Sequence, residues 1–315
     1  MLIAQTKSTN SISSILLILF FWLINVGLSF YEGFENFSNW SDIPLVKLFL
    51  VQFSILATAI LLNKMLQQHK LVGVGDALSG VLFLVFILGV SDVHKYYREF
   101  ISLCLITLGN QKLIGLYNVK KNYLKEFEIG VLFGLSVVIS PSLFLILGMT
   151  FIGLTLVVPF SWRDFCVVLL GCLWIFFLKY TLLFILDAWK FDFTNSVYFS
   201  IPKFNGHIRF QHIALFILFL FETVLFLGVF SVLAKRSIKE RVFYWLWIWT
   251  FIFLLLSLLF FQESSYRLEL VALLGLPCSI FSVEYFLNKG KITRYWRKEI
   301  IVYFFIILQV FLRVY

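Results

Sequence analysis

Acidic residues and arginines lie in the short polar segments between long apolar stretches, and their chemistry suits group transfer from a phosphate donor. A carboxylate can act as a general base or hold a divalent metal, and an arginine can bind a phosphate through two parallel hydrogen bonds. The candidate catalytic acids are Glu32, Glu35, Asp42 and Asp92. The candidate substrate-binding residues are His94, Arg98, Tyr266 and Arg267. The alternative is that these acids have no chemical role, since exposed loops commonly carry acidic residues. The cofactor is unknown, and a divalent metal is the one candidate.

Four charged residues lie within apolar stretches, where an unpaired charge costs at least a few kcal/mol: Lys112, Lys179, Glu222 and Glu284. Lys179 and Glu222 are therefore candidate functional residues of a membrane interior, and they can pair with each other if their helices touch. Lys112 and Glu284 are expected to reach the membrane interface instead. The four histidines are divided between the two predicted sides of the membrane, and no HExxH, Walker or GxSxG motif occurs, so no metal site is predicted.

The composition places these residues in a membrane protein. Hydrophobic residues make up 61% of the 315 residues and charged residues only 14%, which is too apolar for a single soluble core. The net charge of +9 comes from Lys and Arg in short connectors, a pattern typical of the cytoplasmic side of membrane proteins rather than of nucleic-acid binding. Membrane lipid is therefore the expected partner, and nucleic acid is not.

Apolar windows of about 17 to 25 residues predict an all-α bundle of about eleven transmembrane helices. We expect residues 1–315 to form one integral membrane domain. Two of these spans form a hairpin at Arg98–Pro141. The others are Ile12–Phe30, Leu45–Leu62, Val72–Val90, Pro141–Pro159, Phe165–Leu186, Ile213–Leu233, Val242–Phe261, Leu270–Leu287 and Ile300–Leu312. The last span is short and is expected to be tilted, interfacial or packed against its neighbours. The connectors rich in Lys and Arg place the N-terminus in the cytoplasm and the candidate acids outside.

The hairpin Arg98–Pro141 is the most informative part of the pattern. Its first helix turns polar at residues 109–112, and its basic connector is Val119–Glu126. Its second helix carries Gly130 and Gly134 on one face. Because small residues let membrane helices approach closely, this face is a candidate contact for a partner helix.

At Leu108–Pro141, followed by PFSWRDF at residues 159–165, the chain resembles a family of uncharacterised bacterial inner-membrane proteins of about this length. The resemblance covers most of the chain. It implies a multi-pass protein of the bacterial inner membrane but brings no established activity.

Two stretches are also similar to the GT-C membrane glycosyltransferases, which use polyprenyl-phosphate sugars at the outer side of the membrane. Arg98, followed by a span, a basic turn and a span ending at Pro141, resembles their early helical core. YRLELVALLGLP, residues 266–277, resembles their late motif of an Arg-containing outer loop before a Pro-bearing helix. The resemblance implies that Arg267 contacts the donor phosphate and that Asp92 is a second-loop acid. It also implies a catalytic acid in the first outer loop, which offers Glu32, Glu35 and Asp42.

Three hypotheses for function arise from these features. The first is a GT-C-like transferase that handles a polyprenyl-phosphate-linked sugar at the outer face. The second is a non-enzymatic membrane subunit of an envelope or secretion complex, with a partner helix on the face of Gly130 and Gly134. The third is a transporter, for which a midplane cavity near Lys179 and Glu222 is expected.

Overall fold

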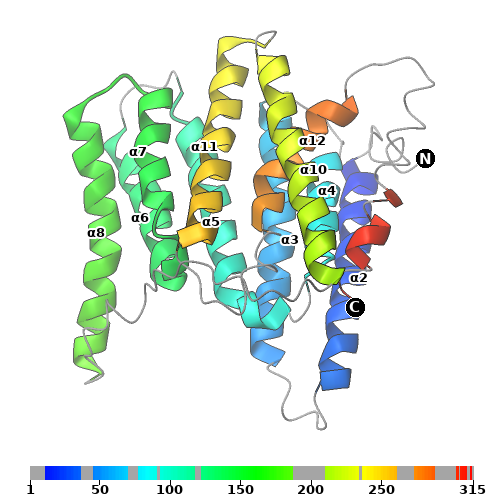
Figure 1. Ribbon diagram of the computed structural model, residues 1–315. Helices are drawn as coiled ribbons and strands as arrows, with labels where there is room; N and C mark the ends of the chain where they lie inside the picture. Colours follow the sequence, from blue (N-terminus) through cyan, green and yellow to red (C-terminus); the bar gives the residue numbers. More distant parts are fainter. Residues whose placement is uncertain are drawn as a thin grey trace. The chain divides into compact units, whose positions relative to one another are not determined.

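The computed structural model describes the chain in blocks separated by gaps (Figure 1). The described residues are 11–36, 45–69, 77–90, 93–117, 122–186, 210–233, 236–260, 273–287, 303–304, 306–310 and 313. Every regular element in these blocks is an α-helix or a 3₁₀-helix, which confirms the predicted all-α class. Helices are expected of an apolar chain in lipid because they pair their own backbone groups.

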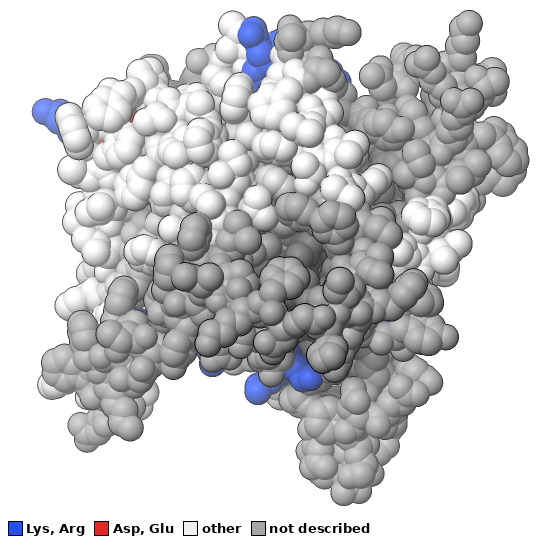
Figure 2. All heavy atoms as spheres, in the orientation of Figure 1, with Lys and Arg blue, Asp and Glu red and all other residues white. Residues whose placement is uncertain are grey.

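Within the described blocks, three helices are long and apolar enough to cross a membrane by length and composition. They are Val46–Gln68, Trp162–Ile185 and Ile238–Leu258. Shorter apolar helices are Ile15–Phe30, Leu78–Ile87, Ile146–Val157 and Leu220–Phe230. On the face shown in Figure 2, the described atoms belong almost entirely to uncharged residues, drawn white. These features indicate a membrane protein, whereas the count of about eleven spans stays a prediction.

The chain divides into two compact units, and the first comprises Met1–Phe100, Asn205–Arg236 and Leu268–Tyr315. Its described helices are α2 (Ser11–Asn36), α3 (Leu45–Gln68), α4 (Leu78–Ile87), η2 (Val93–Tyr96), α10 (Phe210–Leu233) and α12 (Gly275–Leu287). Every residue of α4 is buried, and α2, α3 and α12 pack against it. Gly80 permits this packing, because a Cβ there would lie 2.8 Å from the Ala59 carbonyl oxygen of α3. Helix α4 is therefore the core of the first unit.

The second unit comprises Ile101–Phe204 and Ser237–Arg267. Its described helices are most of α5 (Tyr97–Ile114), α6 (Tyr123–Ile139), η3 (Pro141–Leu143), α7 (Ile146–Val157), α8 (Trp162–Ile185) and α11 (Ile238–Phe260). Helices α6 and α8 approach closely, since a Cβ on Gly130 would lie 2.1 Å from the Val168 carbonyl oxygen. Gly134 also lies against α8. The face expected to receive a partner helix is thus covered by a helix of the same chain.

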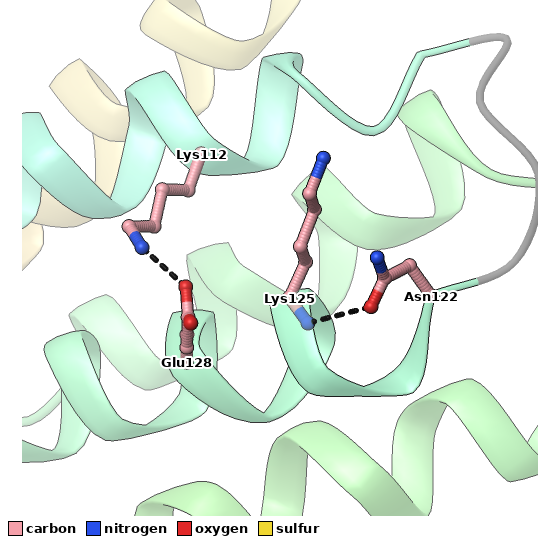
Figure 3. A network of polar contacts seen from close by, with 4 residues as sticks. All are labelled: Lys112, Asn122, Lys125 and Glu128. Carbon is pink, nitrogen blue, oxygen red and sulfur yellow. Dashed lines mark hydrogen bonds and ion pairs between the residues drawn. The ribbon is translucent and has the colours of Figure 1, made fainter.

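The end of α5 carries the polar residues 109–112 predicted for the first helix of the hairpin. The helix continues to Ile114, with the Asn110 side chain 0% exposed. The Asn110 amide nitrogen donates a hydrogen bond to the Thr250 hydroxyl of α11 at 3.2 Å, whereas Asn110 Oδ1 has no hydrogen-bond partner among the described residues. Lys112 is exposed and pairs with the carboxylate of Glu128 on α6, as Figure 3 shows.

Several helices begin earlier than predicted, among them α6 and α8. Helix α6 starts within the expected connector Val119–Glu126, because Asn122 Oδ1 accepts a hydrogen bond from the Lys125 backbone N–H at 3.3 Å (Figure 3). Helix α8 also starts before its predicted span. Each helix carries a buried acid in its first turn, Glu126 in α6 and Asp164 in α8. The helix dipole favours negative charge at that position.

Three described helices are shorter than their predicted spans. Helix α7 follows a 3₁₀ turn that begins at Pro141, because proline starts a turn readily but cannot donate a backbone hydrogen bond. Helix α12 begins at Gly275 and tolerates Pro277 because it lies in the first turn. Helix α4 covers only Leu78–Ile87, and residues 70–76 before it lie outside the described residues.

Candidate functional site

The exposed Lys47 and Arg98 and the half-buried Tyr97 form a cationic group in the first unit, here called the Tyr97 site. The Arg98 Nε donates a hydrogen bond to the Tyr97 hydroxyl at 2.9 Å, and the guanidinium carbon lies 5.5 Å from the ring centroid. The Lys47 Nζ lies 5.4 Å from the same centroid. A cation within about 6 Å of an aromatic ring is attracted to it. Two positive groups thus lie near one ring.

The starts of two helices bring this site together. Lys47 lies in the first turn of α3, and Tyr97 and Arg98 open α5. The short helix η2, directly before α5, packs against α3 and fixes the two starts relative to each other. Glu99 follows in the first turn of α5, so the site also has an acidic neighbour.

Helices α2 and α3 form an antiparallel hairpin beside this site. Gln52, near the start of α3, donates a hydrogen bond to the Ser29 hydroxyl, near the end of α2, at 3.0 Å. The last residues of α2 therefore lie at the same end of the first unit as the start of α3. These last residues include Glu32 and Glu35, and the start of α3 includes Lys47. The backbone thus brings two predicted acids to the end of the unit that holds the Tyr97 site.

A buried polar group, here called the Arg313 cluster, consists of Asn25, Ser29, Gln52 and Arg313. The Arg313 Nη2 donates to the Ser29 hydroxyl at 2.8 Å, and Nη1 donates to Asn25 Oδ1 and to the Leu88 carbonyl oxygen at 3.3 Å each. The Arg313 side chain is 7% exposed. These hydrogen bonds compensate for taking a cation away from water.

A second contact fits the C-terminal segment against the end of α4. Gln309 is buried one helical turn before Arg313. A Cβ on Gly89 would lie only 1.8 Å from Gln309 Oε1, so the glycine makes room for this side chain. Within the last predicted span, Ile300–Leu312, Gln309 is thus packed against the first unit, whereas Tyr303, Phe304 and Ile307 are exposed. Whether this span is tilted, interfacial or packed stays a prediction.

The two charged residues predicted for the membrane interior lie in different units. Lys179 is half-buried on α8 of the second unit, and Glu222 is on α10 of the first unit. The Glu222 side chain is 0% exposed, and neither carboxylate oxygen has a hydrogen-bond partner. The predicted ion pair of these two residues stays a prediction. In the part of the chain that the structure describes, no group of three or more His, Cys, Asp and Glu side chains could hold a metal ion.

The predicted site residues are described to different extents. Arg98 is described in full and belongs to the Tyr97 site. The backbone alone is described for Glu32, Glu35 and His94, which lie in α2 and η2. Outside the described residues lie Asp42, Asp92, Tyr266 and Arg267. The catalytic role of the acids and the phosphate contact of Arg267 therefore stay predictions.

Sequence reasoning missed most of the polar residues that the structure brings together. Lys47 and Tyr97 look like ordinary residues at the ends of spans, and nothing in the sequence pairs them. Asn25 and Ser29 did give a signal, because polar residues four apart lie on one face of a helix. Arg313, close to the C-terminal end of the sequence, gave no indication of contacts with the first hairpin.

The fold and these sites define a helical membrane protein with a buried polar cluster and an exposed cationic site in one unit. Comparison of the whole sequence with known protein families shows the family of this chain. The chain belongs to the family of unknown function DUF6427, which it matches over residues 1–315. This membership confirms the expected resemblance to an uncharacterised family. No curated protein and no solved structure matches the chain.

Proposed function

We propose that this protein binds a polyprenyl-phosphate-linked sugar at the outer face of a bacterial inner membrane, with Lys47 and Arg98 holding the phosphate. The observation that carries the proposal is the Tyr97 site, where two exposed cations meet at one ring. Arg98 offers parallel N–H donors that suit phosphate oxygens, and Lys47 adds a point charge. The long apolar helices supply the lipid-facing surface that an isoprenoid chain requires.

In its enzymatic form, the proposal is a GT-C-like transfer of the sugar to an acceptor. The bond between the sugar anomeric carbon and the phosphate oxygen breaks, and a bond to an acceptor oxygen forms. A first-loop carboxylate takes the acceptor proton, and polyprenyl phosphate leaves with the bonding electron pair. The position of Glu32 and Glu35 at the end of α2, beside the start of α3, supports this form. Asp42 and Asp92 are further candidates for this base, and a divalent metal held by such acids would stabilise the leaving phosphate.

The alternative is a non-enzymatic membrane subunit that uses its aromatic-rich helices as packing surfaces. The face of Gly130 and Gly134 is covered by α8 of the same chain, so this face does not favour that alternative. The exposed apolar side chains of α8, such as Leu170 and Phe177, suit contact with lipid tails equally well. We therefore favour lipid-phosphate binding.

Selectivity for the phosphate tests the proposal. The full-length protein is placed in nanodiscs of phosphatidylethanolamine and phosphatidylglycerol, and binding of polyprenyl phosphate and of the neutral polyprenol is measured by native mass spectrometry. We expect the phosphate to bind at least about tenfold more tightly, because charge-assisted hydrogen bonds are lost with the alcohol. Equal affinities would contradict the proposal. Displacement of the phosphate by excess phosphatidylglycerol would also overturn it, by assigning the site to anionic lipids in general.

The enzymatic form has its own test, which uses a polyprenyl-phosphate hexose as donor. Donor consumption is followed by thin-layer chromatography for Glu32→Gln, Glu35→Gln, Asp42→Asn and Asp92→Asn. We expect one of these changes to abolish consumption while donor binding persists, because a general base acts on the acceptor and not on the phosphate. Unchanged consumption in all four variants would contradict the enzymatic form without contradicting phosphate binding.

A further inference from the structure

Glu222 lies deep within the first unit, far from the Tyr97 site in sequence and on a different helix. It is near the middle of α10, a helix of 24 residues, so it lies about 18 Å from either end of that helix. Its side chain is 0% exposed, and both carboxylate oxygens lack a hydrogen-bond partner. An acidic group in this position is costly unless something neutralises it.

The surroundings of Glu222 on the α12 side are apolar. Helix α10 packs against α12, and the ring of Phe226, one turn after Glu222, lies 6.1 Å from the ring of Phe281 on α12. Leu225, on the same face of α10, is buried as well. Among the described side chains of α12, the thiol of Cys278 is the titratable group that interacts electrostatically with Glu222. This thiol carries no positive charge that could balance a carboxylate.

The kind of cation that can neutralise Glu222 follows from these neighbours. A hard metal cation requires several oxygen ligands around it. Among the described residues, α12 offers the thiol of Cys278, the ring of Phe281 and the hydroxyls of Ser279 and Ser282, which already donate hydrogen bonds to backbone carbonyls of their own helix. No group of three or more His, Cys, Asp and Glu side chains in the described residues could hold a metal ion. A proton requires only one carboxylate oxygen. The site is therefore suited to a proton and not to a metal ion.

We infer that Glu222 is an intramembrane proton-binding site, formed between α10 and α12. The carboxylate takes one proton from the aqueous phase to give the neutral acid, and no electrons are transferred. The neutral acid is compatible with the packed helices, whereas loss of the proton leaves a charge in apolar surroundings. Release of the proton therefore requires water or a counter-charge to reach the α10–α12 contact. This inference does not depend on the proposed phosphate binding.

Infrared spectroscopy tests the inference directly. The full-length protein, labelled with ¹³C-glutamate, is measured in nanodiscs at neutral pH, together with Glu222→Gln and the control Glu128→Gln. Glu128 is the matched control because it is an exposed glutamate paired with Lys112. We expect a carbonyl band of a protonated acid that Glu222→Gln removes and Glu128→Gln retains. A spectrum without that band, or a band that survives in Glu222→Gln, would overturn the inference.

A chemical measurement covers the case in which Glu222→Gln does not fold. Dicyclohexylcarbodiimide, an apolar reagent that reacts with protonated carboxyl groups, is added to the wild-type protein, and the adducts are located by mass spectrometry. A modified Glu222 supports the inference. Adducts on exposed acids such as Glu128 with none on Glu222 would contradict it.

Discussion

The Arg313 Nη2 lies 2.8 Å from the hydroxyl oxygen of Ser29, although the two residues are 284 positions apart in the chain. This hydrogen bond, with those to Asn25 and Leu88, ties the C-terminal segment to α2 and to the end of α4. The segment therefore completes the packing of the first unit. A cation buried in this way is stable only while its partners stay in place.

Replacing Arg313 by Gln removes the cation and most of its donors. We expect the free energy of unfolding to fall by about 2 kcal/mol, because buried hydrogen bonds to a charged group are lost. The melting temperature of the purified protein in detergent micelles measures the effect. Arg241→Gln, at an exposed position in the first turn of α11, is the matched control and should change it little. Equal melting temperatures for the two variants would contradict the role given to Arg313.

Gly89 and Gln309 should be energetically coupled. Gly89→Ala alone is expected to destabilise the protein, because its Cβ meets Gln309 Oε1. Gln309→Ala should relieve this clash, so the double variant is expected to be more stable than the sum of the single effects predicts. The coupling free energy from a double-mutant cycle should be at least about 0.5 kcal/mol. Additive effects would show that Gln309 does not lie against Gly89.

Gly130→Ala tests the close packing of α6 on α8. The added Cβ would lie 2.1 Å from a backbone carbonyl oxygen, which cannot move aside as a side chain can. We expect a loss of about 2 kcal/mol in the free energy of unfolding. Gly27→Ala is the control, because no atom lies within 4 Å of its Cβ position and alanine favours a helix. A Gly130→Ala variant as stable as Gly27→Ala would contradict the observed helix contact.

The hydrogen bond between Asn110 and Thr250 links α5 to α11 within the second unit. Asn110→Leu and Thr250→Val should each destabilise the protein, and the double variant should lose little more than either one. A coupling of about 0.5 to 1.5 kcal/mol is expected for such a bond between membrane helices. Thermal unfolding of the wild type, the two single variants and the double variant gives this coupling free energy. A coupling of zero would contradict a stabilising hydrogen bond between Asn110 and Thr250.

Much of the helical architecture could be predicted from the sequence, for a physical reason. The apolar windows mark helices directly, because a chain in lipid must pair its backbone groups locally. The starts of α6 and α8 were missed because polar residues such as Asn122 and Asp164 were assigned to connectors. Both residues instead belong to the first turns and cap positions of helices, where polar groups are favourable.

The candidate site was less predictable, because it depends on contacts between distant segments. Arg98 was identified from its residue type, but Lys47 became part of the site only through the packing of α3 on η2. The Arg313 cluster was still less predictable, because its residues come from opposite ends of the sequence. Hydropathy predicts where helices lie in the sequence but not which helices are in contact.

The most direct test of phosphate binding is the affinity of the Lys47→Gln/Arg98→Gln double variant for polyprenyl phosphate in nanodiscs. We expect at least about a tenfold increase in Kd over the wild type, because two positive groups at the phosphate are lost. Arg163→Gln, which removes an exposed arginine from the first turn of α8, should leave the Kd unchanged. An unchanged Kd in the double variant, or an equal increase in Arg163→Gln, would contradict the assignment of the phosphate to the Tyr97 site.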